Sequence, residues 1–427
     1  MRDVFQKEIM RGVRLTCVTE YKFKTGCLSI TLLTQLEKST AAMNAVLPAV
    51  LRRGTARHPD MESIAAVLDE LYGVRIEPVV RKKGEIQCIG FYSDFPDDAF
   101  IPSDGRVLEK TADLMGELFL SPATSGGRLR AEYVDGEREN LINDIRAEVN
   151  DKRRYSIMRL SELMCRGERY GVSKLGSLSD AAKISVATLT KHYRKVIAES
   201  EIEIFYCGAA EPARVERALL SALAMLPRVE KSNPPVTEVK YDVKNDAPKY
   251  FEDKLDVTQG KLAIGYRLGE MMKKPNYAVM MVMNAVFGGS VTSKLFLNVR
   301  EKLSLCYFAS SMIDRHKGIM MVSSGIEFSK YDQALSEIRA QLDKVRNGEI
   351  EDWELDSAKR AVVTSILTSM DEPGGLESLY LDRAISGVTI MPEGLAGLVD
   401  VVTKEEVMAA ANSVKEEAVY FLRGEDE

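Results

Sequence analysis

In the first half of the chain, segments of alternating apolar and polar residues are separated by segments in which apolar residues recur every three to four positions. Alternation with β-branched residues predicts strands, and the longer period predicts amphipathic helices. The expected strands are Val13–Thr19, Cys27–Thr34, Arg75–Arg81, Glu85–Tyr92 and Ile202–Cys207. The expected helices are Met61–Tyr72, Val107–Leu120 and a long helical pattern near Glu132–Met164.

The second half repeats this scheme of strands and helices. Its expected strands are Phe251–Val257, Lys261–Arg267, Cys306–Asp314, Gly318–Gly325 and Val419–Leu422. Its expected helices are Tyr277–Phe287, Lys330–Arg346, Trp353–Met370 and Gly375–Ser386. Because hairpins rather than regular strand–helix–strand alternation join these strands, the pattern predicts an α+β fold in which helices cover sheets.

Three short segments recur in the same order in both halves, at offsets of roughly 215 to 240 residues, which indicates a duplicated domain. The pairs are Gly26-Cys-Leu-Ser-Ile-Thr with Gly260-Lys-Leu-Ala-Ile-Gly, Met43-Asn-Ala-Val with Met283-Asn-Ala-Val, and Glu203-Ile-Phe-Tyr-Cys-Gly with Ala418-Val-Tyr-Phe-Leu-Arg-Gly.

A stretch rich in proline, serine and asparagine, Pro227–Pro248, separates the two halves. Paired prolines favour an extended, solvated connection. We therefore expect a first domain over residues 1–226, a linker over 227–248 and a second domain over 249–427.

The amino-acid composition limits the classes of protein to which this chain can belong. Of the 427 residues, 45% are hydrophobic and 29% are charged, which is typical of globular proteins. The net charge of −6 disfavours non-specific binding to nucleic acid or to an anionic membrane. The N-terminal segment has no apolar stretch typical of a secretory signal, and the longest apolar segment, Tyr277–Phe287, is too short to span a bilayer. We expect a cytoplasmic protein.

Cysteine and histidine spacing gives no local metal motif. The six cysteines contain no CxxC pair, and we expect them to be buried free thiols. The three histidines, His58, His192 and His316, lie too far apart for two of them to share one helix face, and HExxH and its inverse HxxEH are both absent. GxSxG and phosphate-loop motifs are absent as well. A zinc site built from distant residues is left open, but no spacing indicates one.

Two longer motifs resemble a known family. Gly288-Gly-Ser-Val-Thr-Ser-Lys-Leu-Phe-Leu-Asn-Val-Arg-Glu-Lys-Leu-Ser-Leu-Cys-Tyr307 resembles the GG-x-x-SRLF-x-x-IREK-x-GLxY signature of the insulinase/pitrilysin metallopeptidases, and Tyr170-Gly-Val-Ser-Lys-Leu-Gly-Ser resembles their PYG-x-x-x-LG-T segment. The resemblance is greatest to the processing-peptidase-like branch and covers nearly the whole chain. It implies two homologous sheet-plus-helix domains that form a clamshell.

The family's zinc-binding HxxEH motif aligns with a segment that has no metal ligands. The two histidine positions carry Ala45 and Ala49, and the general-base position carries Pro48. The distal ligand position, the second glutamate of an E-x₆-E pattern that begins at Glu137, carries Asp144. Methyl groups cannot bind Zn²⁺ and proline cannot transfer a proton, so we expect no metal and no catalytic residue in this chain. The alternative for Asp144 is a solvated charge on a helix.

An arginine and a tyrosine that contact substrate in the family align with Arg300 and Tyr307. A guanidinium and a phenol can stabilise a developing oxyanion. The alternative is that Arg300 pairs with a nearby carboxylate and Tyr307 fills a strand face. The resemblance also places the Gly26–Thr34 strand at a sheet edge that binds an extended peptide, with an ordinary interior strand as the alternative.

The resemblance implies a non-catalytic subunit of a heteromeric zinc peptidase. An HxxEH-bearing paralogue would supply the zinc, and this chain would supply Arg300, Tyr307 and half of a chamber for peptide substrates. A homodimer is the fallback. The alternative function is a catalytically dead scaffold or peptide-binding protein, in an elongation-factor modification pathway to which some paired bacterial members are linked.

Overall fold

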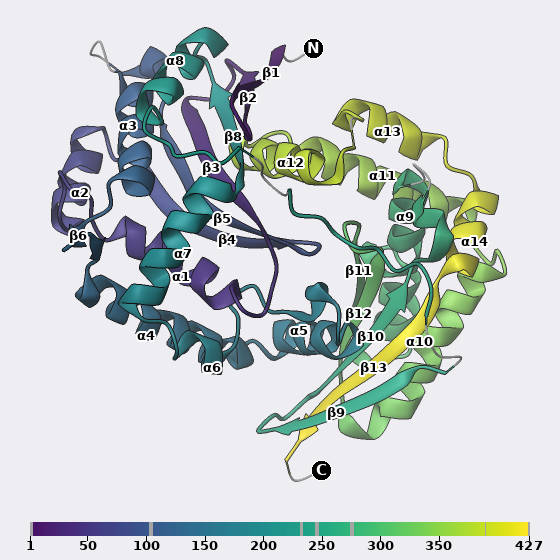
Figure 1. Ribbon diagram of the computed structural model, residues 1–427. Coiled ribbons are helices and arrows are strands. Elements are labelled where there is room, and N and C mark those ends of the chain that lie inside the picture. Colours follow the sequence, from purple (N-terminus) through teal and green to yellow (C-terminus); the bar gives the residue numbers. More distant parts are fainter. Residues whose placement is uncertain are drawn as a thin grey trace. The chain divides into compact units, whose positions relative to one another are not determined.

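The computed structural model of the chain describes residues 3–101, 106–230, 234–243, 247–273, 277–388 and 390–425. The elements group into two compact units, each built on its own sheet (Figure 1). Unit 1 comprises Met1–Arg146, Val172–Val236 and Met370–Val388, and unit 2 comprises Ala147–Gly171, Thr237–Ser369 and Thr389–Glu427.

The described part of unit 1 contains a six-stranded sheet. All its neighbouring strands are antiparallel except β2 and β8, which are parallel. In spatial order the strands are β1 (Asp3–Met10), β2 (Val13–Thr19), β8 (Glu201–Gly208), β3 (Thr25–Gln35), β5 (Ile86–Pro96) and β4 (Arg75–Lys83).

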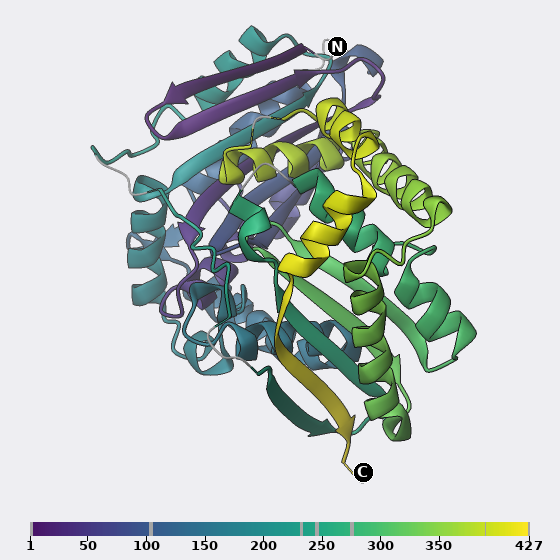
Figure 2. The ribbon, with the colours of Figure 1, turned by 90° about the vertical axis from the view of Figure 1, so that its right-hand side faces the viewer.

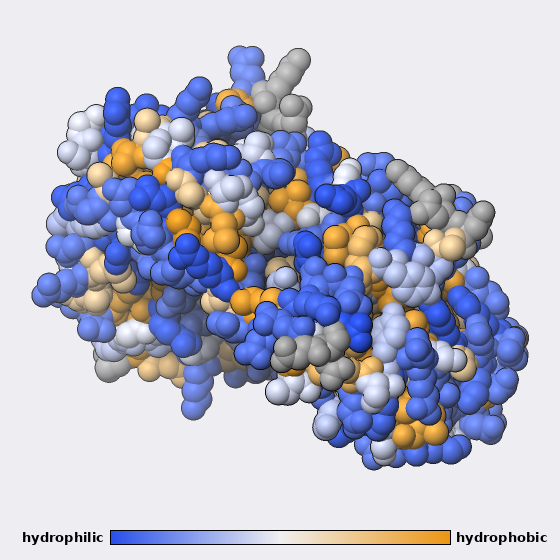
Figure 3. All heavy atoms as spheres, turned by 90° about the horizontal axis from the view of Figure 1, so that it is seen from below, coloured by the Kyte–Doolittle hydropathy of each residue, from blue (hydrophilic) through white to orange (hydrophobic). Residues whose placement is uncertain are grey.

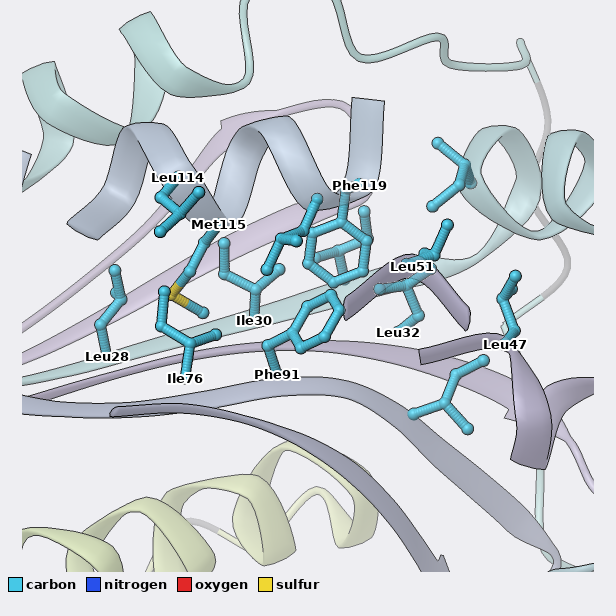
Figure 4. Close-up of a cluster of buried hydrophobic side chains, with 14 of the residues drawn as sticks. Leu28, Ile30, Leu32, Leu47, Leu51, Ile76, Phe91, Leu114, Met115 and Phe119 are labelled. Carbon is cyan, nitrogen blue, oxygen red and sulfur yellow. The ribbon is translucent and has the colours of Figure 1, made fainter. Parts of the chain in front are cut away.

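Helices form a layer on one face of this sheet. The layer and its connections contain α1 (Ala41–Arg52), α2 (Met61–Glu70), α3 (Val107–Leu120), α4 (Ala131–Ala147), α6 (Leu178–Ala181), α7 (Val186–Glu199) and α8 (Pro212–Ala222). Leu28, Ile30 and Leu32 alternate along β3 and point into this layer (Figure 4). Phe91 of β5 meets Phe119 of α3 edge to face, with ring centroids 5.0 Å apart. The alternation of apolar residues along β3 therefore builds the main core of unit 1.

Unit 2 has the same strand order as unit 1. Its described strands are β11 (Cys306–Asp314), β12 (Ile319–Ile326), β10 (Gly260–Arg267), β13 (Lys415–Gly424) and β9 (Lys249–Leu255). They correspond in turn to β4, β5, β3, β8 and β2 of unit 1, and the one parallel pair, β13 with β9, falls at the corresponding place. This topology confirms the duplication predicted from the recurring segments.

A helical layer also covers one face of the unit 2 sheet, and Figure 2 shows α10 and α14 lying across it. The layer contains α9 (Tyr277–Asn284), α10 (Tyr331–Arg346), α11 (Asp352–Thr368), α13 (Pro392–Asp400) and α14 (Lys404–Ser413), with π-helical segments at Ala285–Gly289 and Leu295–Lys302. The Met-rich segment of α9 lies in this core, where Met280 and Met283 are fully buried.

The opposite face of each sheet is covered by a helix from the other half of the sequence. α5 (Lys152–Met164) belongs to unit 2 and packs against β10, β12 and β13. α12 (Pro373–Ser386) belongs to unit 1 and packs against β3 and β8; in Figure 4 it lies on the side of the sheet away from the main core. The compact units therefore do not follow the contiguous division into residues 1–226, 227–248 and 249–427.

The single long helix expected near Glu132–Met164 is two helices. α4 ends at Ala147, a 3₁₀ turn follows, and the Asp151 carboxylate accepts a hydrogen bond from the backbone N–H of Arg154 to cap α5. Apolar periodicity continues through this break, because both helices bury one face. The two helices nevertheless belong to different units, which the periodicity could not indicate.

Apolar packing attaches α5 to its sheet. Leu160 and Met164 lie in a buried cluster with residues of β10 and β13, among them Tyr420. Gly265 of β10 makes room for this helix, because a Cβ atom there would overlap the sulfur of Met164. A larger residue at position 265 would therefore force the Met164 side chain to move.

A buried ion cluster fixes the chain just after α5. The Glu168 carboxylate lies 2.7 Å from the guanidinium of Arg267 and 2.8 Å from the ammonium of Lys317. The side chains of Arg267 and Lys317 are 1% and 0% exposed. Lys240, in the described part of the expected linker, adds a contact at 3.3 Å. Arg267 also pairs with Glu417 of β13, at 2.5 Å. Glu168 is thus the carboxylate that the two buried cations share, and Arg267 has a second one.

The six cysteines are buried, as predicted: Cys17, Cys27, Cys88, Cys165, Cys207 and Cys306. The sequence pattern did not predict β1, α7, α8, α13 or α14. Among the described residues, no helix is both long and apolar enough to cross a bilayer. One face of the molecule, shown in Figure 3, is mostly hydrophilic with small separate hydrophobic patches.

Substituting Glu168→Gln should destabilise the protein. The amide keeps the shape of the side chain but removes the carboxylate that Arg267 and Lys317 share, and Arg267 keeps only Glu417. We therefore expect a loss of about 3 kcal/mol in unfolding free energy. Denaturant titration followed by circular dichroism measures it. Asp343→Asn is the control, because it breaks the pair with Arg346 while its side chain is 59% exposed; it should cost under about 1 kcal/mol. Equal losses in both variants would contradict the prediction.

Lowering the pH should reduce the contribution of the Glu168 ion cluster to the stability of the fold. Burial raises the pKa of Glu168, but the hydrogen bond from Lys317 and the charge of Arg267 outweigh it and lower the pKa from 4.5 to about 2. A folded-state pKa below the unfolded value means that ionised Glu168 stabilises the fold above about pH 4.5, and that this contribution disappears as the pH falls towards about 2. The difference in stability between wild type and Glu168→Gln should therefore shrink over this interval. If the stability difference between wild type and Glu168→Gln does not change with pH, the prediction is wrong.

Candidate functional site

The segment that aligns with the family's zinc motif forms helix α1. Ala45 and Pro48 are buried and Ala49 is half-buried. Positions 45 and 49 are four residues apart and so share one face of the helix. Pro48 lies inside the helix and has no N–H to donate to the preceding turn. The two positions from which a pair of imidazoles would project thus present only methyl groups.

An ion pair joins this face of α1 to α4. Arg53, which caps α1 and lies one further turn along the face of Ala45 and Ala49, places its Nε 2.9 Å from Glu137 Oε1. Glu137 is the first glutamate position of the E-x₆-E pattern. Asp144 lies two helical turns further along α4, is exposed, and has no ion-pair or hydrogen-bond partner within the described residues.

These residues do not fit a zinc ion. Zn²⁺ takes three or four nitrogen, sulfur or carboxylate ligands in a tight shell. The family positions offer two methyl groups, a proline ring and one exposed carboxylate. No group of three or more His, Cys, Asp or Glu side chains that could hold a metal occurs in the described part of the chain. The Pro48 side chain can neither accept nor donate a proton, so it cannot act as the general base in peptide hydrolysis.

Arg300 and Tyr307 lie in two contacting segments of unit 2. Arg300 is in the last turn of the π-helical segment, where its guanidinium lies 4.7 Å from the ring centroid of Phe296 and 3.5 Å from the Glu301 carboxylate. Its side chain is 41% exposed. Tyr307 is the second residue of β11, at an irregularity in the pairing with β12, and is 65% exposed. Its ring is therefore not buried in a strand face, and both side chains retain exposed polar groups.

The strand expected to present a free edge lies inside the sheet. β3, which contains the Gly26–Thr34 segment, pairs with β5 on one side and with β8 on the other. The expectation of a peptide-binding edge there is wrong, because both rows of its backbone groups are already paired. The edge strands of this sheet are β1 and β4. β4 contains Pro78, which has no N–H for a further strand.

One polar site was not predicted. Asn44 of α1 and His192 of α7 are 148 residues apart in sequence but form a hydrogen bond of 2.6 Å, and both line a cavity in unit 1. From the sequence, His192 was interpreted as an isolated histidine, since no local spacing connects it to Asn44. The recurring Met-Asn-Ala-Val segment contains Asn44, but this repeat was interpreted only as a sign of duplication.

The comparisons with known proteins point to the family that the motifs resemble. A family model described as Peptidase M16 inactive domain matches residues 183–362. The chain is 33% identical to the probable inactive metalloprotease YmfF of Bacillus subtilis over 413 residues, which are 97% of this chain and 96% of that protein.

Solved structures show the same architecture. A conserved protein from Enterococcus faecalis has a TM-score of 0.90 and 27% identity, with 99% of each chain covered. A peptidase M16 inactive domain from Pseudomonas fluorescens has a TM-score of 0.78 and 16% identity, with 99% of this chain and 98% of that chain covered; at that identity the likeness shows the fold alone.

The chain belongs to the M16 peptidase family, the insulinase/pitrilysin metallopeptidases that its motifs resemble. Within that family it is an inactive metalloprotease homologue, similar over nearly its full length to YmfF. The methyl groups and proline at the three aligned positions of α1 are consistent with this likeness, because none of them can bind a metal or transfer a proton.

Restoring the ligands should create a metal site. In an Ala45→His/Ala49→His/Asp144→Glu variant, two imidazoles project from one face of α1 and a longer carboxylate from α4, so we expect one bound Zn²⁺ per chain, against none for the wild type. Metal analysis after dialysis and the absorption spectrum of the Co²⁺ form measure this. The control carries Gln instead of His at position 49. Equal metal contents in variant and control would contradict the alignment.

Proposed function

We propose that this chain is the non-catalytic subunit of a heteromeric zinc peptidase. Its partner is an M16 paralogue with an intact HxxEH motif, which holds the zinc ion and the general-base glutamate. This chain completes the peptide-binding chamber and supplies Arg300 and Tyr307 to the substrate. The substrate class is a peptide or an unfolded segment, because the family's paired domains enclose the chain that they cleave.

The alignment carries the proposal. The positions aligned with the family's metal site hold no ligands, while those aligned with its substrate-contacting arginine and tyrosine keep both residue types, with exposed side chains. A scaffold would not need a guanidinium and a phenol at these two positions. Arg300 has only its sequence neighbour Glu301 as a carboxylate partner at 3.5 Å among the described residues, and such exposed pairs contribute little to stability. Tyr307, at 65% exposed, contributes little to the core.

The chemistry of the two side chains suits a supporting role. Arginine keeps its charge at all physiological pH values and can donate two parallel hydrogen bonds to a peptide carbonyl or carboxylate. The tyrosine hydroxyl donates a hydrogen bond while its ring lies against an apolar side chain of the substrate. Fixed donors of this kind stabilise negative charge on a carbonyl oxygen during hydrolysis. Neither group requires a metal ion in this chain.

Substituting Arg300→Ala or Tyr307→Phe should lower the turnover of the mixed complex about tenfold or more, because each removes one donor to the reacting carbonyl. The assay mixes this chain with the HxxEH paralogue from the same genome and follows cleavage of a quenched fluorescent peptide library. Size-exclusion chromatography with light scattering measures assembly, which should be unchanged.

Lys302→Ala is the matched control, since Lys302 is an exposed cation in the same π-helical segment. It should cleave at the wild-type rate. If the wild-type mixture assembles but cleaves nothing, the chain is a scaffold or binding protein. If the mixture cleaves and both variants match wild type, the role given to Arg300 and Tyr307 is wrong.

A further inference from the structure

Unit 1 contains a cavity of about 300 Å³ between the end of β3, the start of α1 and the second half of α7. Since one water molecule occupies about 30 Å³ of liquid, this volume has room for a small organic molecule. The polar lining includes Thr34, Glu37, Asn44, His192 and Lys195. Ala45, Pro48 and Ala49 do not line it, so the cavity is distinct from the degenerate zinc positions.

A chain of buried hydrogen bonds fixes the orientation of the amides beside this cavity. The Gln87 Nε2 group donates to the carbonyl oxygens of Ala41 at 3.0 Å and Lys174 at 2.6 Å. Carbonyl oxygens only accept, so the other atom of the amide, Oε1, is an acceptor. It receives a hydrogen bond from Asn44 Nδ2 at 2.9 Å. The Asn44 amide donates also to Thr34 Oγ1, at 3.1 Å, which leaves its Oδ1 as an acceptor.

This orientation determines the tautomer of His192. Its Nε2 lies 2.6 Å from Asn44 Oδ1, an acceptor, and must therefore carry the proton. In the neutral ring Nδ1 is then a hydrogen-bond acceptor. Nδ1 has no hydrogen-bond partner among the described residues, although the ring is only 9% exposed. Burial, with a smaller effect of the Lys195 ammonium, lowers the pKa of His192 to about 4, so the ring is neutral near pH 7.

The rim of the cavity bears both signs of charge. Glu37 and Glu199 provide carboxylates, and Lys195 provides an ammonium group that lies 3.9 Å from Glu199. The side chains of Lys195 and Glu199 are 67% and 50% exposed, so each can reorient towards a ligand at little cost. Leu33 and Val196 add apolar surface inside. The lining thus combines a histidine whose Nδ1 is an acceptor, charged side chains of both signs and apolar side chains.

We propose that this cavity binds a small zwitterion of about amino-acid size, with its ammonium group donating to His192 Nδ1 and its carboxylate paired with Lys195. The side chain of the ligand lies against Leu33 and Val196, and Glu37 and Glu199 add attraction for the ammonium group. This site is independent of the proposed peptidase partnership, because its contacts come from unit 1 of this chain alone.

The test uses free L-amino acids one at a time, each with its N-acetyl and its carboxamide derivative. Binding to the full chain is measured by isothermal titration calorimetry, and long-range ¹H–¹⁵N spectra of histidine-labelled protein report on the His192 nitrogens. We expect at least one amino acid to bind and to shift the Nδ1 resonance. Both derivatives should bind about tenfold or more weakly, because each lacks one charged group.

Two variants of α7 complete the test. Lys195→Met removes the cation at the rim and should weaken binding of the amino acid about tenfold, whereas Lys191→Met, an exposed lysine one turn earlier that does not line the cavity, should leave it unchanged. Both positions are exposed, so folding is preserved. The proposal is overturned if no amino acid binds, if the N-acetyl derivative binds as well as the parent, or if binding leaves Nδ1 unshifted.

Discussion

The fold depends on covering the second face of each sheet with a helix from the other half of the sequence. A sheet with one helical layer still has an apolar face, and in unit 2 that face includes Ala263, Met321 and Tyr420. α5 covers it, and α12 covers the corresponding face in unit 1. α5 follows α3 and α4 after the β4–β5 hairpin, and α12 follows α10 and α11 after the β11–β12 hairpin. The two helices thus hold equivalent places in the two halves of the sequence, and each belongs to the unit of the other half. Neither contiguous half contains all the elements of one compact unit.

The ion cluster after α5 explains how this exchange tolerates buried charge. Arg267 and Lys317 are almost wholly enclosed, and an isolated buried cation would cost several kcal/mol. Arg267 also has Glu417 of the neighbouring strand β13 as a partner. Glu168 comes from the segment that follows α5, so the carboxylate that Arg267 and Lys317 share reaches them only when α5 is in place. The apolar contacts of Met164 hold α5 against its sheet. A state in which α5 is detached would take the Glu168 carboxylate away from Lys317. Packing and electrostatics thus favour the same arrangement.

The sequence predicted most strands of both sheets well, because these segments are rich in β-branched and apolar residues. β1 was missed because its residues are mostly exposed or half-buried and show no clear alternation. The division of the Glu132–Met164 pattern into α4 and α5 could not be predicted, since the period continues through Asp151. The assignment of Ala45, Pro48, Ala49 and Asp144 to the family's zinc-site positions rests on motif alignment alone and stays a prediction. The Asn44–His192 contact was missed because 148 residues separate its partners.

The two sides of helix α1 are under different structural constraints. Its Asn44 forms buried hydrogen bonds with Gln87 and His192. Removing one of these partners leaves an unsatisfied buried group at a cost of about 1–3 kcal/mol. The face with Ala45 and Ala49 has no such requirement, because small apolar side chains can replace metal ligands without leaving a buried polar atom unpaired. One side of α1 can therefore lack the metal ligands of a peptidase, while the other side keeps Asn44 fixed in the lining of the cavity.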